Sequence, residues 1–364
     1  MKKDAIIDAD AHVLETETTW SYIDKSNLKY RPILYSSTQK PDRQYWVLED
    51  KIVGVRFPTL TEQEIKKFSE VTARKMVTDT VVKEMNDIAL RLKHLDELKI
   101  DIQVLHNTIW LEGITENVTA EIVLSESWNR WMADIWKQGN NRLFWSCVVP
   151  TLNIPEALQQ MQEFKKYGAV AVFLRSFERN FALTDDYFYP IYDLATKLDM
   201  AVITHASNGN LANSELLKSH PGGFVRNAFS IFRVPVMISC YDLLMSEVLQ
   251  QFPHLRWGFI EATSQWVPWV IHEVKTRLME DNIQLSPTVF RDHHMYVSCQ
   301  EDDDLQWILN YTTDHGVVTG TDYGHLDPAS NLDAISIIQN RPDLSPQQKH
   351  NILHENPKKL YGLK

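Results

Sequence analysis

Asp8, Asp10 and His12 alternate with alanines in a β-branched run near the start of the chain, Ala5-Ile6-Ile7-Asp8-Ala9-Asp10-Ala11-His12-Val13. Successive side chains of a strand point to opposite faces, so these three share one face. Two carboxylates and an imidazole at a strand end repel one another and lose hydration, and a divalent cation would offset both costs. The alternative is a surface strand end whose carboxylates cap the next segment. The motif indicates half of a metal site.

Other candidates for the same chemistry stand where later strands are expected to end. His205 closes the apolar run Ala201-Val202-Ile203-Thr204, and Asp322 stands between Gly320 and Gly324 in a tight turn. A core histidine satisfied by the backbone and a turn-capping aspartate are the structural alternatives. Five of the predicted strands carry such residues at or near their ends, namely Asp10 with His12, His106, His205, Glu261 and Asp322.

Short β-branched runs alternate with segments whose apolar residues recur three and four positions apart, which is typical of parallel βα units. Eight runs are predicted as strands, at Ala5–Asp10, Ile102–His106, Leu143–Pro150, Ala169–Arg175, Ala201–His205, Trp257–Glu261, Met295–Cys299 and Val317–Asp322. The segments between them are predicted as helices, at Val82–Leu98, Ala120–Asn140, Ile154–Tyr167, Tyr187–Leu198, Val236–Gln251, Trp266–Glu280 and Asp303–Thr313. This order predicts an α/β fold of the (β/α)₈ TIM barrel type, in which residues at the carboxyl ends of strands form the active site.

The stretch between the first two strands, about residues 20–80, is too long for one βα unit. It includes an alternating run, Tyr45–Val53, that predicts a small hairpin. We interpret the stretch as an insertion over the mouth of a barrel that spans residues 1–364 as one domain. A second excursion, Asn208–Pro235, should border the same mouth. The closing segment, Ser345–Lys364, predicts a helix that Ser345 caps and that Pro357 ends or kinks.

Composition limits the classes of partner. The net charge is −11, which argues against nucleic acid or an anionic membrane as the main partner. Three widely spaced cysteines in apolar surroundings, Cys147, Cys240 and Cys299, suggest buried reduced thiols. The first strand follows Met1 without an apolar signal region, and no apolar run is long enough to span a bilayer. We therefore expect a cytoplasmic enzyme of a small-molecule substrate.

Several segments in this order resemble the amidohydrolase superfamily, and within it the amidohydrolase-2 or ACMSD-like group of barrel enzymes. Besides the opening motif, these are Arg91–Leu98 with Lys99-Ile100-Asp101, similar to "R…LD…GID", Phe252-Pro253-His254-Leu255-Arg256, similar to "FPDL", the Gly320–His325 turn, and Asn356–Gly362, similar to "NA…LYGL". The resemblance covers nearly the whole chain. It also implies that a homodimer is to be expected.

The resemblance implies a metal site made of Asp10, His12, His205 and Asp322, with Asp8 as a buried support. Many members carry histidine where this chain has Asp10, and others carry an acid. Such a mixed nitrogen and oxygen set suits one zinc or manganese ion, and iron(II) is also compatible. Members with two metals bridge them by a carboxylated lysine or a glutamate at the end of the fourth strand, where this chain has Arg175.

Roles for the remaining residues follow from their positions. Arg175 either holds a substrate carboxylate or pairs with a neighbouring acid. Glu261 replaces a histidine that members often carry on the sixth strand, and its apolar neighbours favour proton exchange near neutral pH. Three further residues are candidates for substrate binding at the mouth, His325, His106 and Trp266.

Two reactions are compatible with these residues. In the first, a metal-dependent decarboxylase acts on a small aromatic or unsaturated carboxylic acid, and Asp322 or Glu261 delivers a proton to the carbon that loses CO₂. In the second, a metal-activated water hydrolyses an amide, lactone or similar bond, and Asp322 takes the proton. A barrel without metal or activity is a third possibility, which the ligands retained on three strands disfavour.

Overall fold

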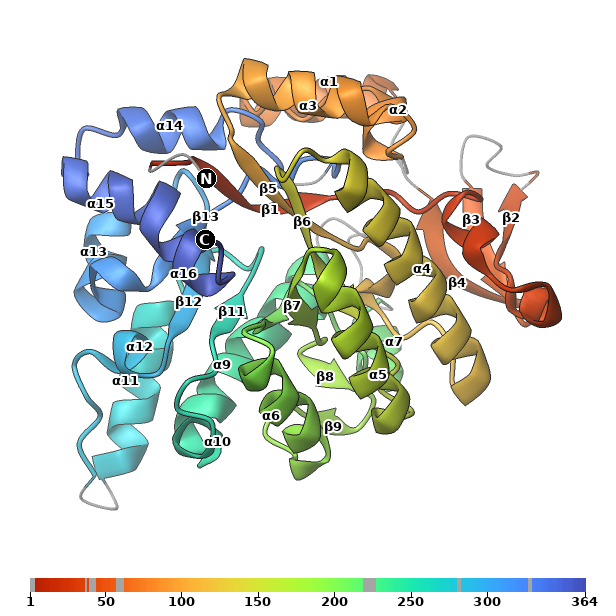
Figure 1. The fold of residues 1–364 in the computed structure, drawn as a ribbon. Helices are drawn as coiled ribbons and strands as arrows, with labels where there is room; N and C mark the ends of the chain where they lie inside the picture. Colours follow the sequence, from red (N-terminus) through yellow and green to blue (C-terminus); the bar gives the residue numbers. More distant parts are fainter. Residues whose placement is uncertain are drawn as a thin grey trace.

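A computed structural model describes residues 4–36, 38, 44–56, 62–218, 227–279, 283–326 and 329–364. At its centre, eight parallel strands follow one another around a barrel, with helices outside (Figure 1). In order they are β1 (Ile7–His12), β5 (Ile102–His106), β6 (Leu143–Val148), β7 (Ala169–Phe173), β10 (Ala201–Thr204), β11 (Trp257–Phe259), β12 (Met295–Cys299) and β13 (Val317–Thr319). All eight predicted strands are present, which confirms the (β/α)₈ prediction.

The barrel closes between its first and last strands through the segment that follows β13. Asp322 donates its backbone N–H to the carbonyl of Asp10 at 2.9 Å, and His12 donates to the carbonyl of Tyr323 at 2.7 Å. Gly320 allows this approach, because a Cβ there would stand 2.3 Å from the Cβ of Asp10. These contacts form the seam of the barrel, where β1 lies beside the turn that follows β13.

The outer helices turn one apolar stripe toward the strands. They are α4 (Val118–Gln138), α5 (Ile154–Phe164), α6 (Tyr189–Lys197), α9 (Val234–Met245), α10 (Val248–Gln251), α11 (Val267–Leu278), α12 (Val289–Asp292), α13 (Leu305–Thr312) and α14 (Ala334–Asn340). In α5, Ala157, Met161 and Phe164 recur at helical spacing and are buried, and Asn153 caps the first turn. Among the helices in the described part of the chain, none is long and apolar enough to cross a membrane.

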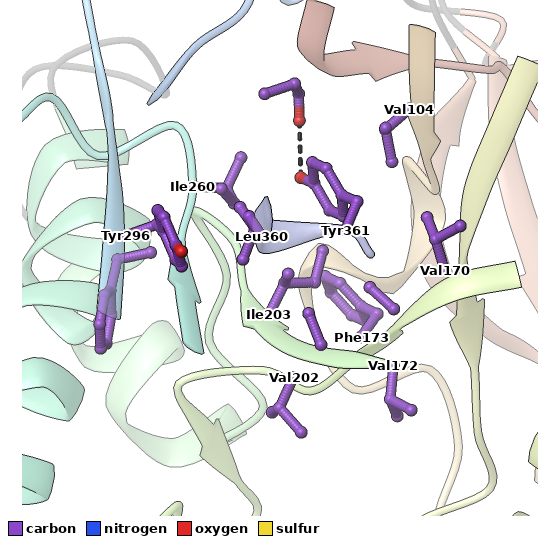
Figure 2. Close-up of a cluster of buried hydrophobic side chains, with 14 of the residues drawn as sticks. Val104, Val170, Val172, Phe173, Val202, Ile203, Ile260, Tyr296, Leu360 and Tyr361 are labelled. Atoms are coloured by element: carbon purple, nitrogen blue, oxygen red, sulfur yellow. Dashed lines mark hydrogen bonds between the residues drawn. The ribbon is translucent and has the colours of Figure 1, made fainter. Parts of the chain in front are cut away.

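The C-terminal segment closes the amino end of the barrel. It runs through α15 (Pro346–His350), a π-helical turn (Asn351–Glu355) and α16 (Asn356–Leu360). Figure 2 shows Leu360 and Tyr361 among Ile203 and Ile260, and the Tyr361 hydroxyl donates to the carbonyl of Ala9 at 2.7 Å. Of the two expectations for Pro357, that it ends the helix or that it kinks it, the first is wrong, because Pro357 lies in the first turn of α16. Because the π-helical turn before it is wider, the missing N–H and the ring are accommodated.

The insertion after β1 contains more structure than the predicted hairpin. Strands β3 (Gln44–Leu48) and β4 (Lys51–Arg56) form that hairpin, and β2 (Ile33–Ser36) adds a third antiparallel strand. Trp46 packs edge-on against Trp20 at 5.8 Å, and Trp20 lies 5.9 Å from Trp110, just beyond β5. These contacts place the sheet near the carboxyl end of the barrel. That it covers the entrance for a substrate stays a prediction.

Several helix boundaries differ from the prediction. The expected helix Val82–Leu98 is two helices, α2 (Thr80–Lys83) and α3 (Ile88–Leu98), because Met85 has a left-handed φ of 56° and Asp87 caps a new helix through the N–H of Leu90. The expected helix Val236–Gln251 is also divided, because the backbone of Ser246 is extended and separates α9 from α10. The insertion also holds α1 (Glu62–Thr72) and the 3₁₀ turns Thr19–Tyr22 and Lys25–Tyr30.

The second excursion, which follows β10, is only partly described. It contains α7 (Leu211–Lys218) and a π-helical turn (Phe229–Arg233) that precedes Pro235 in α9, and residues 219–226 lie outside the described part. Further along, Cys240 and the other two cysteines, Cys147 and Cys299, are buried and unpaired, as predicted.

Candidate active site

A cluster at the carboxyl end of the barrel contains the four predicted metal ligands, Asp10, His12, His205 and Asp322. The Nε2 atoms of His12 and His205 are 3.1 Å apart, and Oδ1 of Asp10 lies 3.2 Å from Nε2 of His205 and 3.4 Å from Nε2 of His12. Oδ1 of Asp322 lies 3.5 Å from Nε2 of His12. All four side chains are at least 95 % buried. The structure thus brings β1, β10 and the segment after β13 to one point.

The spacing of these atoms fits a single divalent ion. Bonds of about 2.0–2.2 Å in a tetrahedral arrangement separate neighbouring ligand atoms by about 3.3–3.6 Å. Four separations are 3.1–3.5 Å, namely those that join His12 to Asp10, His205 and Asp322 and the one between Asp10 and His205. In addition, Nδ1 of His12 is 2.9 Å from the carbonyl of Asn107, which fixes the ring with Nε2 toward the cluster. The residues therefore fit the metal that the sequence implied.

The electrostatics keep two of the predicted ligands, His12 and Asp10, in forms that bind metals. Burial, with His325 and His205 nearby, holds the pKa of His12 well below its usual value, so its imidazole is neutral at pH 7. Burial alone would raise the pKa of Asp10, yet His205 and His12 hold it well below its usual value. A neutral imidazole beside an ionised carboxylate is the state that coordinates a cation without first releasing protons.

Asp8 is not part of this cluster. Its carboxylate accepts hydrogen bonds from the N–H and hydroxyl of Thr321 at 2.9 and 2.6 Å and from the amide of Gln103 at 2.8 Å. The strand register is irregular between Asp8 and Ala11, which breaks the simple alternation assumed for the motif. Burial raises the pKa of Asp8 to about 6. Asp8 therefore has the supporting place predicted for it.

Glu261 reaches the cluster from just beyond β11. Its Oε2 lies 3.1 Å from Nε2 of His205 and 3.7 Å from Nε2 of His12, and its backbone N–H donates to the Ser298 hydroxyl at 2.7 Å. Both Glu261 and Asp322 have left-handed backbones, with φ of 58° and 49°. Such conformations cost about 1 kcal/mol or more for residues other than glycine and concentrate at functional sites.

His325 lies against the cluster rather than at an open mouth. Its ring stacks on that of His12 with centroids 3.6 Å apart, and its Nδ1 is 2.9 Å from Oδ1 of Asp322. Its Nε2 is 2.9 Å from the Thr108 hydroxyl. Because both ring nitrogens face protein atoms, the predicted contact of His325 with a substrate gains no support.

The other three predicted substrate contacts are not among the metal-ligand candidates, although the ring of His106 packs beside those of His12 and His205, with centroids 5.8 and 5.4 Å away. Arg175 is buried and its guanidinium is bound by Glu178, which matches the alternative of a neighbouring acid. The two nitrogens of the His106 ring lie 2.9 Å from the Ser146 hydroxyl and 3.2 Å from the carbonyl of Ala9, and burial lowers its pKa to about 4. Trp266 donates to the carbonyl of Ala262 at 3.1 Å.

Two residues near the site, Ser330 and Thr108, were not assigned a role from the sequence, and a third, Asn107, was expected only to be structural or to line the pocket. Ser330 donates to Oδ2 of Asp322 at 2.7 Å, and Thr108 contacts His325. The side chain of Asn107 is fully buried, and neither polar atom of its amide has a hydrogen-bond partner among the described residues. The sequence signal for Asn107 and Thr108 was their place directly after His106, at the end of a strand. The sequence around Ser330 carried no such signal.

Comparisons with known proteins agree with the fold. The structure of an amidohydrolase from Mycobacterium avium subsp. paratuberculosis is similar, with a TM-score of 0.74 at 16% identity. The match covers 100% of this chain and 99% of that one. A 5-carboxyvanillate decarboxylase from Novosphingobium aromaticivorans, solved with bound manganese, has a TM-score of 0.66 at 13% identity over 99% and 98% of the two chains. A 4-oxalomesaconate hydratase from Rhodopseudomonas palustris has a TM-score of 0.61 at 15% identity, over 98% of this chain and 96% of its own.

Sequence comparison assigns the family. No curated protein matches the chain significantly. The family model described as amidohydrolase, in contrast, matches residues 7–363, which is nearly the full length and includes every member of the cluster. The resemblance inferred from the motifs is thereby confirmed. The chain belongs to the amidohydrolase family.

Proposed function

We propose that this protein is a metal-dependent enzyme that decarboxylates a small aromatic or unsaturated carboxylic acid without oxidation. The observation that carries the proposal is the convergence of buried ligand atoms at the carboxyl end of the barrel, where Asp10, His12 and His205 form one close group and Asp322 approaches it at His12. Two imidazoles and two carboxylates would hold one zinc or manganese ion, and iron(II) fits the same set. The manganese of the related decarboxylase supports the choice of metal.

A single ion is favoured by the residue at position 175. An arginine cannot bridge two cations, and Arg175 is bound to Glu178. The described part of the chain has two close groups of candidate ligand atoms, Asp10 with His12 and His205, and His12 with Glu261, Asp322 and His325, and the two groups share His12. We therefore assign one metal to the site.

When bound, the ion supplies a positive charge that polarises the substrate's carboxylate or a neighbouring hydroxyl. The chain's own residues supply the proton and the enclosure. Glu261, whose Oε2 is 3.1 Å from Nε2 of His205, would donate the proton that the reacting carbon receives, and Asp322 is the other candidate. The bond between this carbon and the carboxylate breaks, CO₂ leaves, and the proton takes its place on the carbon.

Hydrolysis of an amide or lactone is the second candidate. It is favoured by the family model, which is described as amidohydrolase, and addition of water is the activity named for the related hydratase. The same four ligands serve this reaction, and Asp322 would accept the proton of the attacking water. Glu261 then has no required role, so the two reactions differ in what Glu261 must do.

A substrate panel read by two labels separates the reactions. Hydroxybenzoates, unsaturated dicarboxylates, amides and lactones are incubated with the manganese-loaded protein in H₂¹⁸O, and both CO₂ and ¹⁸O in the organic product are measured. Decarboxylation predicts CO₂ without ¹⁸O in the remaining product, and loss of this activity in Glu261→Gln. If ¹⁸O enters the product and no CO₂ appears, the hydrolase assignment replaces the decarboxylase assignment.

The other expectations stay predictions. We propose a small molecule as the substrate because the cluster is enclosed in a barrel of a family of small-molecule enzymes. A cytoplasmic location and a homodimer are retained as proposals, which cell fractionation and sedimentation measurements can test.

A further inference from the structure

The ring of His325 lies across the seam where the barrel closes. It stacks on the ring of His12, with centroids 3.6 Å apart and planes at 22°, and its Nδ1 is 2.9 Å from Oδ1 of Asp322. His12 belongs to β1 and Asp322 follows β13, so the ring touches predicted metal ligands on both sides of the seam. Its own exposure is 2%, which leaves it little freedom to move.

Thr108 fixes the far edge of that ring. Its hydroxyl lies 2.9 Å from Nε2 of His325 and 2.9 Å from the carbonyl of Val13, the residue that follows β1. Since a hydroxyl both donates and accepts, it can serve the ring and the carbonyl together. The ring is thereby tied to the main chain next to His12.

Glu15 holds Thr108 in place. Its carboxylate accepts hydrogen bonds from the backbone N–H of Thr108 at 3.0 Å, from that of Ile109 at 3.2 Å and from the indole N–H of Trp128 at 3.0 Å. Glu15 and Thr108 are both buried. The loop that carries the hydroxyl is therefore pinned from its other side, and the chain of contacts runs from Glu15 through Thr108 and His325 to Asp322.

We propose that His325 and Thr108 form a brace that positions Asp322 and His12 for metal binding, with Glu15 as its anchor. Among the described residues, two main-chain hydrogen bonds join β1 to the turn after β13, and a rigid ring across this seam helps to set how far apart the two predicted ligands stand. His325 is a positioning residue here and not a contact of the substrate. The proposal rests on the metal site of the proposed function.

Metal affinity tests the brace without any knowledge of the substrate. Thr108→Val removes the hydroxyl at nearly constant volume, Thr108→Ser retains it, and His325→Phe keeps a flat ring without nitrogens. The control is Thr312→Val, because Thr312 is also buried and, among the described residues, its hydroxyl bonds only main-chain carbonyls of α13 and the next residue. The dissociation constant of Mn²⁺ is measured by electron paramagnetic resonance, and the visible spectrum of the Co²⁺ form reports the ligand geometry.

We expect Thr108→Val and His325→Phe to weaken Mn²⁺ binding by about 10- to 100-fold, the range for residues that orient metal ligands, and to shift the Co²⁺ bands. Thr108→Ser should keep the wild-type Mn²⁺ affinity and Co²⁺ spectrum, and Thr312→Val should change neither. Wild-type affinity and spectrum in Thr108→Val and His325→Phe would overturn the brace alone. An equal loss in Thr312→Val would overturn it too, by showing a general effect of destabilisation. A wild-type protein that binds no metal would overturn the proposed function together with the brace.

Discussion

Replacing Glu15 by glutamine should change how the stability of the protein depends on pH. Glu15 is fully buried, and burial raises its pKa from 4.5 to about 7 even though three N–H groups donate to its carboxylate. At pH 6, the folded protein therefore keeps a proton that the unfolded chain has released. Unfolding releases this proton, so the contribution of Glu15 to stability falls as the pH rises from 4.5 toward 7 and is constant above.

The size of the effect follows from the two pKa values. A displacement from 4.5 to about 7 corresponds to about 3 kcal/mol, at about 1.4 kcal/mol per pH unit. Most of this falls between pH 5 and pH 8. Glutamine does not titrate, so the difference in unfolding free energy between wild type and Glu15→Gln isolates the carboxyl. The variant also loses the acceptor for one of two backbone N–H groups, which costs about 1–3 kcal/mol at every pH.

The assay is urea unfolding of both proteins, followed by tryptophan fluorescence at pH 5, 6, 7 and 8. We expect wild type to lose about 2.5 kcal/mol relative to Glu15→Gln across this range. A difference that is the same at all four pH values would refute the raised pKa. A difference that grows in favour of wild type as the pH rises would mean that the three N–H donors outweigh the cost of burying the charge.

Three other predictions follow from the same contacts. Mn²⁺ at 100 times its dissociation constant should stabilise the protein by about 2.7 kcal/mol, which for 364 residues raises Tm by about 3–4 °C, and excess chelator should reverse the shift in calorimetry. Asn107→Leu should leave the unfolding free energy within about 1 kcal/mol, because the amide has no partner in the described residues, and should raise KM if the amide binds the substrate; an unchanged KM would exclude that contact. Glu178→Gln should cost about 3–5 kcal/mol in urea unfolding, because it leaves the buried Arg175 without its counter-charge, and a cost below 1 kcal/mol would contradict the buried pair.

The barrel and the candidate residues at its strand ends could be predicted from the sequence because both depend on local patterns, whereas the choice of four metal ligands among those residues came from the resemblance to the amidohydrolase superfamily. The strand ends at His205 and Glu261 follow directly from short apolar runs, and parallel strands bring such ends to one rim. Helix boundaries were less predictable. Pro357 and Met85 show why, since a π-helical turn and a left-handed residue are choices that packing makes against local preference.

The surroundings of the cluster depend on contacts between distant segments, which periodicity does not reveal. His325 was expected at the mouth because it follows Asp322, but its ring turns onto His12, more than three hundred residues away in the chain. Thr108 and Ser330 touch the cluster without any signature of their own, since threonine and serine occur at many strand ends and turns. For Arg175, the sequence left two partners open, and the structure shows Glu178.

The most direct test of the metal centre is an anomalous-scattering map from crystals of the protein grown with Mn²⁺. We predict one strong peak enclosed by Asp10, His12, His205 and Asp322, with ligand atoms at about 2.0–2.3 Å. A map with no peak among these four residues, or with its only peak bound elsewhere, would contradict the assignment of this cluster as the metal centre.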